Sequence, residues 1–136
     1  MKIKDLMSRD VEIARPDDSL QHVAGRMAAG DFGFMPVVEE DRVIGTITDR
    51  DLTVRALAKG AGADDKVSQY LSRDAITALD TDDLKTALDL MSRARIRRLP
   101  VTDKHGRLVG VISLGDLSVK VKERYAGEAL ESISQR

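Results

Sequence analysis

A motif of the form G-h-h-[ST]-x-x-D, in which h is Ile, Val or Thr, occurs twice in the chain. It reads Gly45-Thr-Ile-Thr48-Asp-Arg-Asp51 in the first half and Gly110-Val-Ile-Ser113-Leu-Gly-Asp116 in the second. A hydroxyl followed three residues later by an acid is the pattern of a helix capping box, and we expect this role at both places. A capped helix start also gathers free backbone N–H groups and the positive end of the helix dipole, which suits a phosphate.

The same two motifs could instead bind a sugar phosphate. A carboxylate at a helix start can accept hydrogen bonds from two neighbouring hydroxyls. Thr48 or Ser113 would then reach a phosphate or a ribose, and Asp51 or Asp116 would accept from the ribose 2′- and 3′-hydroxyls. Taken alone, the motif favours capping, so the binding role has to be supported by its surroundings.

The motif belongs to a longer internal repeat, in which residues 2–54 align with residues 66–119. At an offset of 64 residues, identical residues coincide: Lys2, Ser8, Arg9, Asp10, Asp18, Leu20, Met27, Pro36 and Val37 match Lys66, Ser72, Arg73, Asp74, Asp82, Leu84, Met91, Pro100 and Val101. After one inserted residue, the offset becomes 65, and Arg42, Gly45, Ile47, Asp51, Leu52 and Val54 match Arg107, Gly110, Ile112, Asp116, Leu117 and Val119. The chain is therefore a duplication.

Both repeats predict the same order of elements, which is strand, helix, strand, strand, helix. Apolar residues with helical spacing indicate amphipathic helices near residues 20–28 and 84–91, each preceded by capping residues. Hairpins are expected at residues 34–39 with 42–48 and at residues 99–103 with 107–113. A short extended run precedes each first helix, at residues 11–14 and 75–78, and a second helix begins near Asp49 and Leu114.

This order of elements predicts an α+β fold with pseudo-two-fold symmetry. We expect repeat one at residues 1–60, a linker at 61–65, repeat two at 66–124 and a helical tail at 125–136. A unit of about 60 residues buries too little surface to be stable by itself, so the repeats should pack through their sheets as one body. The groove between them would then hold two related sites.

Two copies of this order of elements, each with h-P-[VT] in the second strand and G-h-h-[ST]-x-x-D after the third, resemble a tandem pair of CBS domains, also called a Bateman module. The resemblance covers nearly all of residues 1–124. It implies a regulatory, non-catalytic unit that senses AMP, ADP, ATP, NAD or S-adenosylmethionine in the cleft between the repeats. Asp51 and Asp116 would be the ribose acids. The implied adenine slots, read by backbone groups of the first strand, lie at Ile13, Ala14, Met35 and Pro36, and at Thr77, Ala78, Leu99 and Pro100.

The two predicted sites are not equal. Arg50 lies beside the phosphate position of the first motif, where the second has Leu114 and Gly115, so we rank the Asp51 site ahead. Arg97 and Arg98 stand at the start of a strand, where successive side chains face opposite ways, and one of them should point into the cleft. Guanidinium groups bind phosphate through paired hydrogen bonds, which favours a polyphosphate or a dinucleotide.

Composition argues against several classes of function. With 22 basic and 23 acidic residues, no net field draws the chain to nucleic acid or to an anionic membrane, and aromatic residues make up only 3%. The absence of cysteine removes disulfides and thiolate chemistry and fits a reducing compartment. No signal peptide or spanning segment is evident, so we expect a cytoplasmic protein. His22 and His105 are isolated, which offers neither a metal site nor a base for a nucleophile.

We therefore expect a nucleotide-sensing module that is not an enzyme and has no cofactor beyond its regulatory ligand. It would act in trans on an unidentified effector protein or as a homodimer. The alternative is a ligand-free dimeric scaffold read by a protein partner, and an enzyme would need a hidden catalytic group. Near-helical spacing of apolar residues from Leu117 to Ile133 indicates that the tail extends the last helix, either as a frayed surface helix or as a dimer or partner contact.

Overall fold

The first repeat folds around an antiparallel hairpin in the computed structural model, which describes residues 1–134. Strand β1 (Phe34–Glu39) pairs with β2 (Arg42–Thr48), and helix α1 (Leu20–Gly30) precedes them. The Ser19 hydroxyl caps α1 by accepting the His22 amide at 3.0 Å. Helix α1 buries Leu20, Val23 and Met27 against the hairpin, as their helical spacing predicts.

The second repeat has the same order and a three-stranded sheet. Strand β4 (Arg98–Thr102) lies between β3 (Ala78–Leu79), which is parallel to it, and β5 (Leu108–Ser113), which is antiparallel. Helix α2 (Leu84–Ala94) precedes β4, and helix α3 (Leu114–Ser134) follows β5. The predicted pair of hairpins and the α+β class are therefore confirmed.

The first extended run of each repeat is shorter than the sequence predicts. In repeat one it is a single parallel bridge between Ala14 and Val37, with the Ala14 amide donating to the Pro36 carbonyl at 2.9 Å. Residues 11–13 form no strand, and Pro16, which has no amide hydrogen, prevents the strand from continuing on the other side of Ala14. In repeat two the strand is only Ala78–Leu79.

The helical segment after β2 is irregular, whereas its counterpart α3 is a regular α-helix. Residues Asp51–Ala56 form a π-helix (η2), and Leu57–Lys59 continue as a 3-10 turn (η3). Gly60 ends this segment in the left-handed region with a φ of 85°. The predicted linker at residues 61–65 follows directly.

The core of each repeat is completed by a short segment from the start of the other repeat. Ile3, Leu6 and Met7 are buried in the core of the second repeat, together with Leu99 and Ile112. Val67 and Leu71 are buried in the core of the first repeat. The short 3-10 turns η1 (Ile3–Asp5) and η4 (Val67–Gln69) carry Ile3 and Val67, and Leu6, Met7 and Leu71 follow these turns. The two repeats are thus joined by exchanged segments as well as by their sheets.

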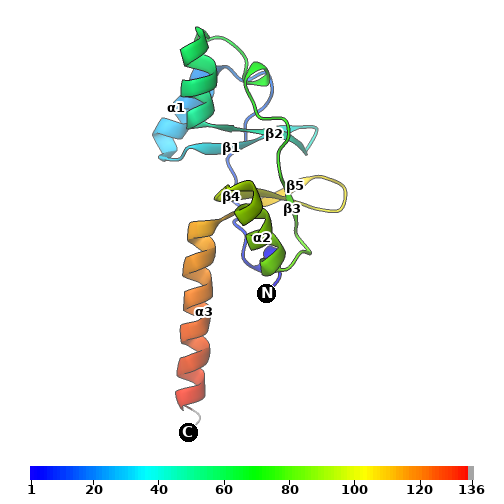
Figure 1. The fold of residues 1–136 in the computed structure, drawn as a ribbon, viewed down its shortest axis with the longest axis vertical. Coiled ribbons are helices and arrows are strands. Elements are labelled where there is room, and N and C mark those ends of the chain that lie inside the picture. Colours follow the sequence, from blue (N-terminus) through cyan, green and yellow to red (C-terminus); the bar gives the residue numbers. More distant parts are fainter. Residues whose placement is uncertain (135–136) are drawn as a thin grey trace.

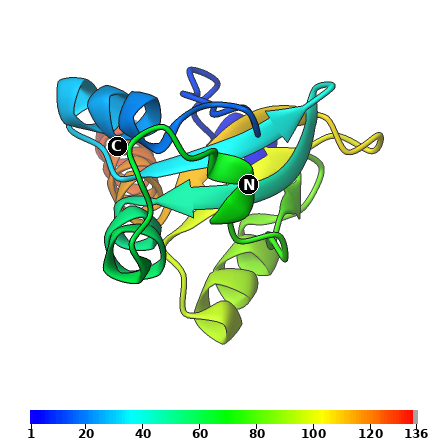
Figure 2. The ribbon, with the colours of Figure 1, turned by 90° about the horizontal axis from the view of Figure 1, so that it is seen from above.

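Matching backbone bridges relate the two halves by pseudo-two-fold symmetry. Thr46 exchanges two amide hydrogen bonds with Ser72 at 3.0 and 2.9 Å, and Val111 exchanges two with Ser8, both at 2.9 Å. These contacts require glycine beside them, because a Cβ on Gly45 would lie 2.4 Å from the Ser72 carbonyl oxygen. Figure 1 shows the two hairpins facing each other in the middle of the molecule, with the helices outside, and Figure 2 shows the same layers from above.

Helix α3 begins in the body of the molecule and then extends away from it (Figure 1). Its first turns are anchored, since Leu117 is buried and the Lys120 ammonium donates to the Leu6 carbonyl at 2.6 Å. The tail therefore does extend the last helix as far as Ser134, and residues 135 and 136 lie outside the described part of the chain. Within the described residues, no helix is both long enough and apolar enough to cross a membrane.

Candidate functional site

A cleft of about 450 Å³ opens between the two repeats on the side of the first motif. In repeat one, its walls come from the start of β1, the end of β2 and the helical turn that follows β2. In repeat two, they come from the segment between η4 and β3 and from the start of β4. The lining residues are Gly33, Phe34, Thr46, Thr48, Asp49, Arg50, Asp51, Ser72, Asp74, Ala75, Ile76, Ile96, Arg97, Arg98 and Pro100.

Asp51 is held in the cleft by a reciprocal capping box. Its carboxylate Oδ2 accepts the Thr48 amide at 3.0 Å, and its own amide donates to Thr48 Oγ1 at 3.1 Å. The other oxygen, Oδ1, lies 3.7 Å from Arg55, and the Asp51 side chain is 13% exposed. Each carboxylate oxygen offers two acceptor positions, so capping leaves acceptors on Asp51 for a ligand.

Close packing brings the start of β1 against the same helical turn. The Asp49 amide donates to the Gly33 carbonyl at 3.0 Å, and the Asp49 carboxylate accepts the Arg50 amide at 2.8 Å. A Cβ on Gly33 would lie 2.5 Å from Asp49 Oδ2, so this approach needs glycine unless the Asp49 side chain moves. The entry to β1 therefore contributes to the wall of the cleft.

Three arginines line this cleft from both repeats. Arg50 comes from the first motif, Arg98 is the first residue of β4 in the opposite repeat, and Arg97 precedes it. All three are exposed. Of the residues predicted to contact ribose or phosphate, the structure thus brings Thr48, Arg50, Asp51, Arg97 and Arg98 together around one cavity.

The residues predicted to form the adenine slot are placed less uniformly. Pro100 lines the cleft, but its neighbours Leu99 and Ala78 have 0% and 1% of their surfaces exposed and belong to the core of the second repeat. The cleft meets Ala75 and Ile76, and Thr77 is not among its lining residues. Any contact of the buried residues with a ligand would have to use their backbone atoms.

Sequence reasoning did not single out Ile76 and Ile96, the two largest aliphatic side chains of the cleft wall. Ile76 is 38% exposed, so its side chain is accessible from the cleft. The available signal for Ile96 was its place in the sequence, directly before the two arginines predicted to reach phosphate.

The second motif is differently arranged. The Asp116 amide donates to Ser113 Oγ at 3.1 Å, but in the described part of the chain no hydrogen bond reaches the Asp116 carboxylate, which is exposed. Ala14 and Met35 are fully buried in the core of the first repeat, and Pro36 is buried beside them. Ile13 is half-buried, and its carbonyl accepts a hydrogen bond from Arg26 at 2.5 Å.

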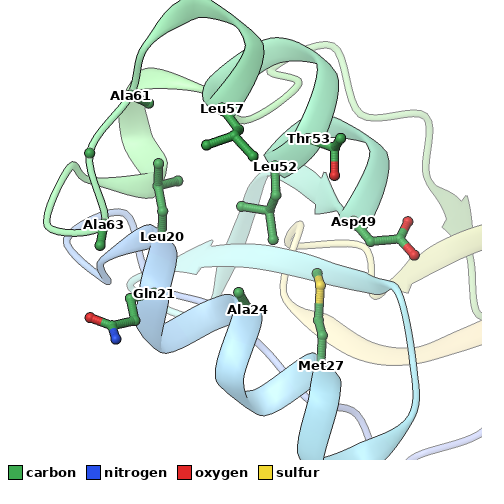
Figure 3. Close-up of a pocket in the computed structure, with 11 residues that line it drawn as sticks. Leu20, Gln21, Ala24, Met27, Asp49, Leu52, Thr53, Leu57, Ala61 and Ala63 are labelled. Atoms are coloured by element: carbon green, nitrogen blue, oxygen red, sulfur yellow. The ribbon is translucent and has the colours of Figure 1, made fainter.

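A separate groove of about 460 Å³ lies on the outer, helical side of repeat one (Figure 3). It runs between α1 and η2, and the linker closes one end. Its wall is mainly apolar and consists of Leu20, Gln21, Ala24, Met27, Asp49, Leu52, Thr53, Leu57, Ala61, Gly62 and Ala63. Leu57 is 68% exposed. None of the predicted ligand residues lines this groove.

The described residues contain no group of three or more His, Cys, Asp or Glu side chains placed to hold a metal ion. The cleft lining includes acids, arginines, hydroxyls and apolar residues, with neither histidine nor cysteine. Chemically, this set is suited to hydrogen bonding a diol, holding an anion and covering a flat apolar ring.

Comparisons with known proteins identify the family of the chain. CBS domain-containing protein YhcV of Bacillus subtilis (strain 168) is 36% identical over 135 residues, covering 98% of this chain and 96% of the relative. The inosine-5'-monophosphate dehydrogenase of Thermoplasma acidophilum is 32% identical over 117 residues, which cover 86% of this chain but 23% of that enzyme.

Among solved structures, the CBS domain pair of protein MJ0100 in complex with 5'-methylthioadenosine and S-adenosyl-L-methionine superposes with a TM-score of 0.79 at 25% identity. It covers 91% of this chain and 98% of that one. The CBS domain profile itself matches twice, at residues 3–57 and 67–123, which coincide with the two repeats. The chain therefore belongs to the CBS domain family and is built from a pair of CBS domains.

Proposed function

We propose that this protein is a regulatory module that binds an adenine nucleotide in the cleft at Asp51. The observation that carries the proposal is the meeting of the Asp51 carboxylate with Arg97 and Arg98 of the opposite repeat around one cavity. Asp51 would accept from the ribose hydroxyls, and the guanidinium groups would hold phosphate. The adenosyl ligands in the complex of the MJ0100 domain pair support this choice of ligand class.

The apolar part of the cleft suits a purine. Ile76, Ile96 and Pro100 offer a surface for the flat base on the side contributed by repeat two. Thr48 and the helical turn that follows it would stay near the ribose and the first phosphate, where free amides and the helix dipole favour negative charge. In this arrangement the ligand contacts both repeats, so binding would stabilise one relative orientation of the two.

We infer a regulatory role rather than a catalytic one. The cleft lining has no histidine, cysteine or metal cluster, and the inosine-5'-monophosphate dehydrogenase match spans only a minor part of that enzyme. The module would act in trans on an effector protein. We propose a cytoplasmic location, with which a sequence that has no cysteine is consistent.

We also propose that two copies associate through their helical sides. The groove between α1 and η2 is mainly apolar, and Val54, Leu57, Leu88 and Val119 remain exposed on helical segments of both repeats. Covering such surfaces with a second copy would remove apolar area from water. Sedimentation of the full chain tests this, because a dimer at micromolar concentration is expected, and a monomer at all concentrations would contradict it.

A thermal melt screen with AMP, ADP, ATP, NAD and S-adenosylmethionine tests the function. A ligand at 100 times its Kd raises the free energy of unfolding by about 2.7 kcal/mol, so a binder should give a clear rise in Tm. Because Asp51 would accept two hydrogen bonds worth about 1.5–3 kcal/mol each, Asp51→Ala should weaken binding at least ten-fold. No shift with any adenylate would instead support the ligand-free scaffold.

A further inference from the structure

The pseudo-two-fold axis identifies which residues surround the second cleft. The bridge between Thr46 and Ser72 beside the first cleft has its counterpart in the bridge between Val111 and Ser8. The second motif must therefore face the segment that follows Ser8, as the first motif faces the segment that follows Ser72. Position by position, the residues of the first cleft can then be compared with those of the second.

The second cleft lacks one of the three cations of the first, because Arg50 corresponds to Gly115. Arg97 and Arg98 correspond to Gly33 and Phe34, and all four residues line the first cleft. The same symmetry therefore places both arginines beside the second cleft as well. A phosphate in the second cleft would lose the charge-assisted hydrogen bonds that Arg50 could donate.

The apolar wall also differs. Ile76 of the first cleft corresponds to Glu12, and Leu90, which packs against the core of repeat two, corresponds to Arg26. Arg26 forms an ion pair with the Glu12 carboxylate, and its other nitrogen donates to the carbonyl of Ile13 at 2.5 Å. The second cleft thus has a charged pair at the position of a hydrophobic wall, and one of its edge carbonyls is already engaged.

We propose that each chain binds one phosphate-bearing adenine nucleotide, at the Asp51 cleft, and that the Glu12–Arg26 pair, together with the glycine in place of Arg50, excludes it from the second cleft. This inference rests on the proposed function. Glu12 repels a phosphate, and displacing Arg26 would leave both the Glu12 carboxylate and the Ile13 carbonyl without their partner. The unequal halves of the duplication would then give the module a single input for nucleotides.

Calorimetric titration of the full chain with ATP, and separately with AMP, tests the stoichiometry. One binding event with close to one nucleotide per chain is expected. Asp51→Asn keeps an acceptor for the Thr48 amide and so preserves the cap, and it should weaken that event at least ten-fold without revealing another tight one. Two nucleotides per chain, or an unweakened event in Asp51→Asn, would overturn the inference while leaving nucleotide binding itself in place. No binding of any adenylate would refute the proposed function as well.

Two variants test the cause of the difference. Glu12→Gln removes a charge from the second cleft alone, so it should leave the affinity of the single event within two-fold of the wild type. The triple variant Glu12→Ile, Arg26→Leu and Gly115→Arg gives these three positions the residues of their counterparts in the other repeat, and a Cβ at Gly115 meets no atom within 4 Å. A second, weaker event is expected in this variant. A stoichiometry that stays at one in a variant with an unchanged melt would contradict the charge explanation.

Discussion

The Asp51 carboxylate accepts the Thr48 amide at 3.0 Å while the Asp51 amide donates to the Thr48 hydroxyl at 3.1 Å. The equivalent pair in the other repeat keeps only the bond from the Asp116 amide to the Ser113 hydroxyl, at 3.1 Å. The same motif therefore makes a complete capping box in one repeat and half of one in the other. The carboxylate of Asp51 therefore contributes to the helix cap, whereas the carboxylate of Asp116 does not.

Replacing each acid by alanine should change stability unequally. Asp51→Ala removes a cap that satisfies a helix amide, so we expect it to lower the free energy of unfolding by about 0.5–2 kcal/mol. Asp116→Ala should change it by less than about 0.5 kcal/mol, because the exposed carboxylate holds no hydrogen bond in the described chain. Urea denaturation without ligand measures both, and equal losses would count against the geometry of the two caps.

Two glycines control the contact between the repeats. A Cβ on Gly45 would lie 2.4 Å from Leu71 Cδ1 and from the Ser72 carbonyl oxygen, and one on Gly110 would lie 2.6 Å from Met7 Sδ. Gly45→Ala and Gly110→Ala should therefore each destabilise the protein by about 1–3 kcal/mol. Gly25→Ala, in the open middle of α1, is the matched control and should be neutral or stabilising. If the three variants melted alike, the close approach would be refuted.

The packing of the N-terminal segment on the second repeat can be tested by truncating one side chain. Ile3 is fully buried in the core of the second repeat, so Ile3→Ala should cost about 2–5 kcal/mol. Hydrogen exchange should show the loss of protection first in β4 and β5, although these strands are far along the chain. Loss confined to β1 and β2 would mean that the segment packs on the wrong repeat.

The same segment is linked to α2 by an ion pair whose pH dependence has a definite sign. A hydrogen bond and the charge of Lys2, 2.9 Å away, lower the pKa of Asp83 below the usual 3.8. A carboxylate with a depressed folded pKa adds stability above its unfolded pKa, and this contribution is lost as the pH falls through the folded value. An NMR titration should find the pKa of Asp83 low in the wild type and back at its usual value in Lys2→Met. An unchanged pKa would exclude the pairing.

Periodicity and repetition were sufficient to predict much of the fold. The α1 and α2 helices, both hairpins and the paired sheets follow from apolar spacing that is the same in two copies, each supporting the other. The exchange of N-terminal segments could not be predicted, because the apolar spacing of Ile3, Leu6 and Met7 shows that one face is buried but not against which repeat. The π-helical turn at Asp51–Ala56 has no sequence signature either.

The site was predictable where charge and motif coincide. Thr48, Arg50, Asp51 and the two arginines of β4 meet around one cavity because the motif fixes the helix start and the symmetry brings the opposite strand to it. The residues that line the cleft beside the proposed position of the adenine base were harder to predict, since a shift of one residue in a strand reverses the direction of every side chain. That shift separates Ile76, which lines the cleft, from Thr77, which does not.

The most direct test of nucleotide binding at Asp51 is the mapping of backbone amide shifts by NMR as AMP is added to the full chain. We expect the largest changes at Thr48, Arg50, Asp51, Ile76 and Arg98, which belong to both repeats and surround one cleft. The amides of Leu20, Ala24 and Leu57 around the outer helical groove should move little. The absence of shifts at saturating AMP, or shifts centred on the outer groove, would contradict the account.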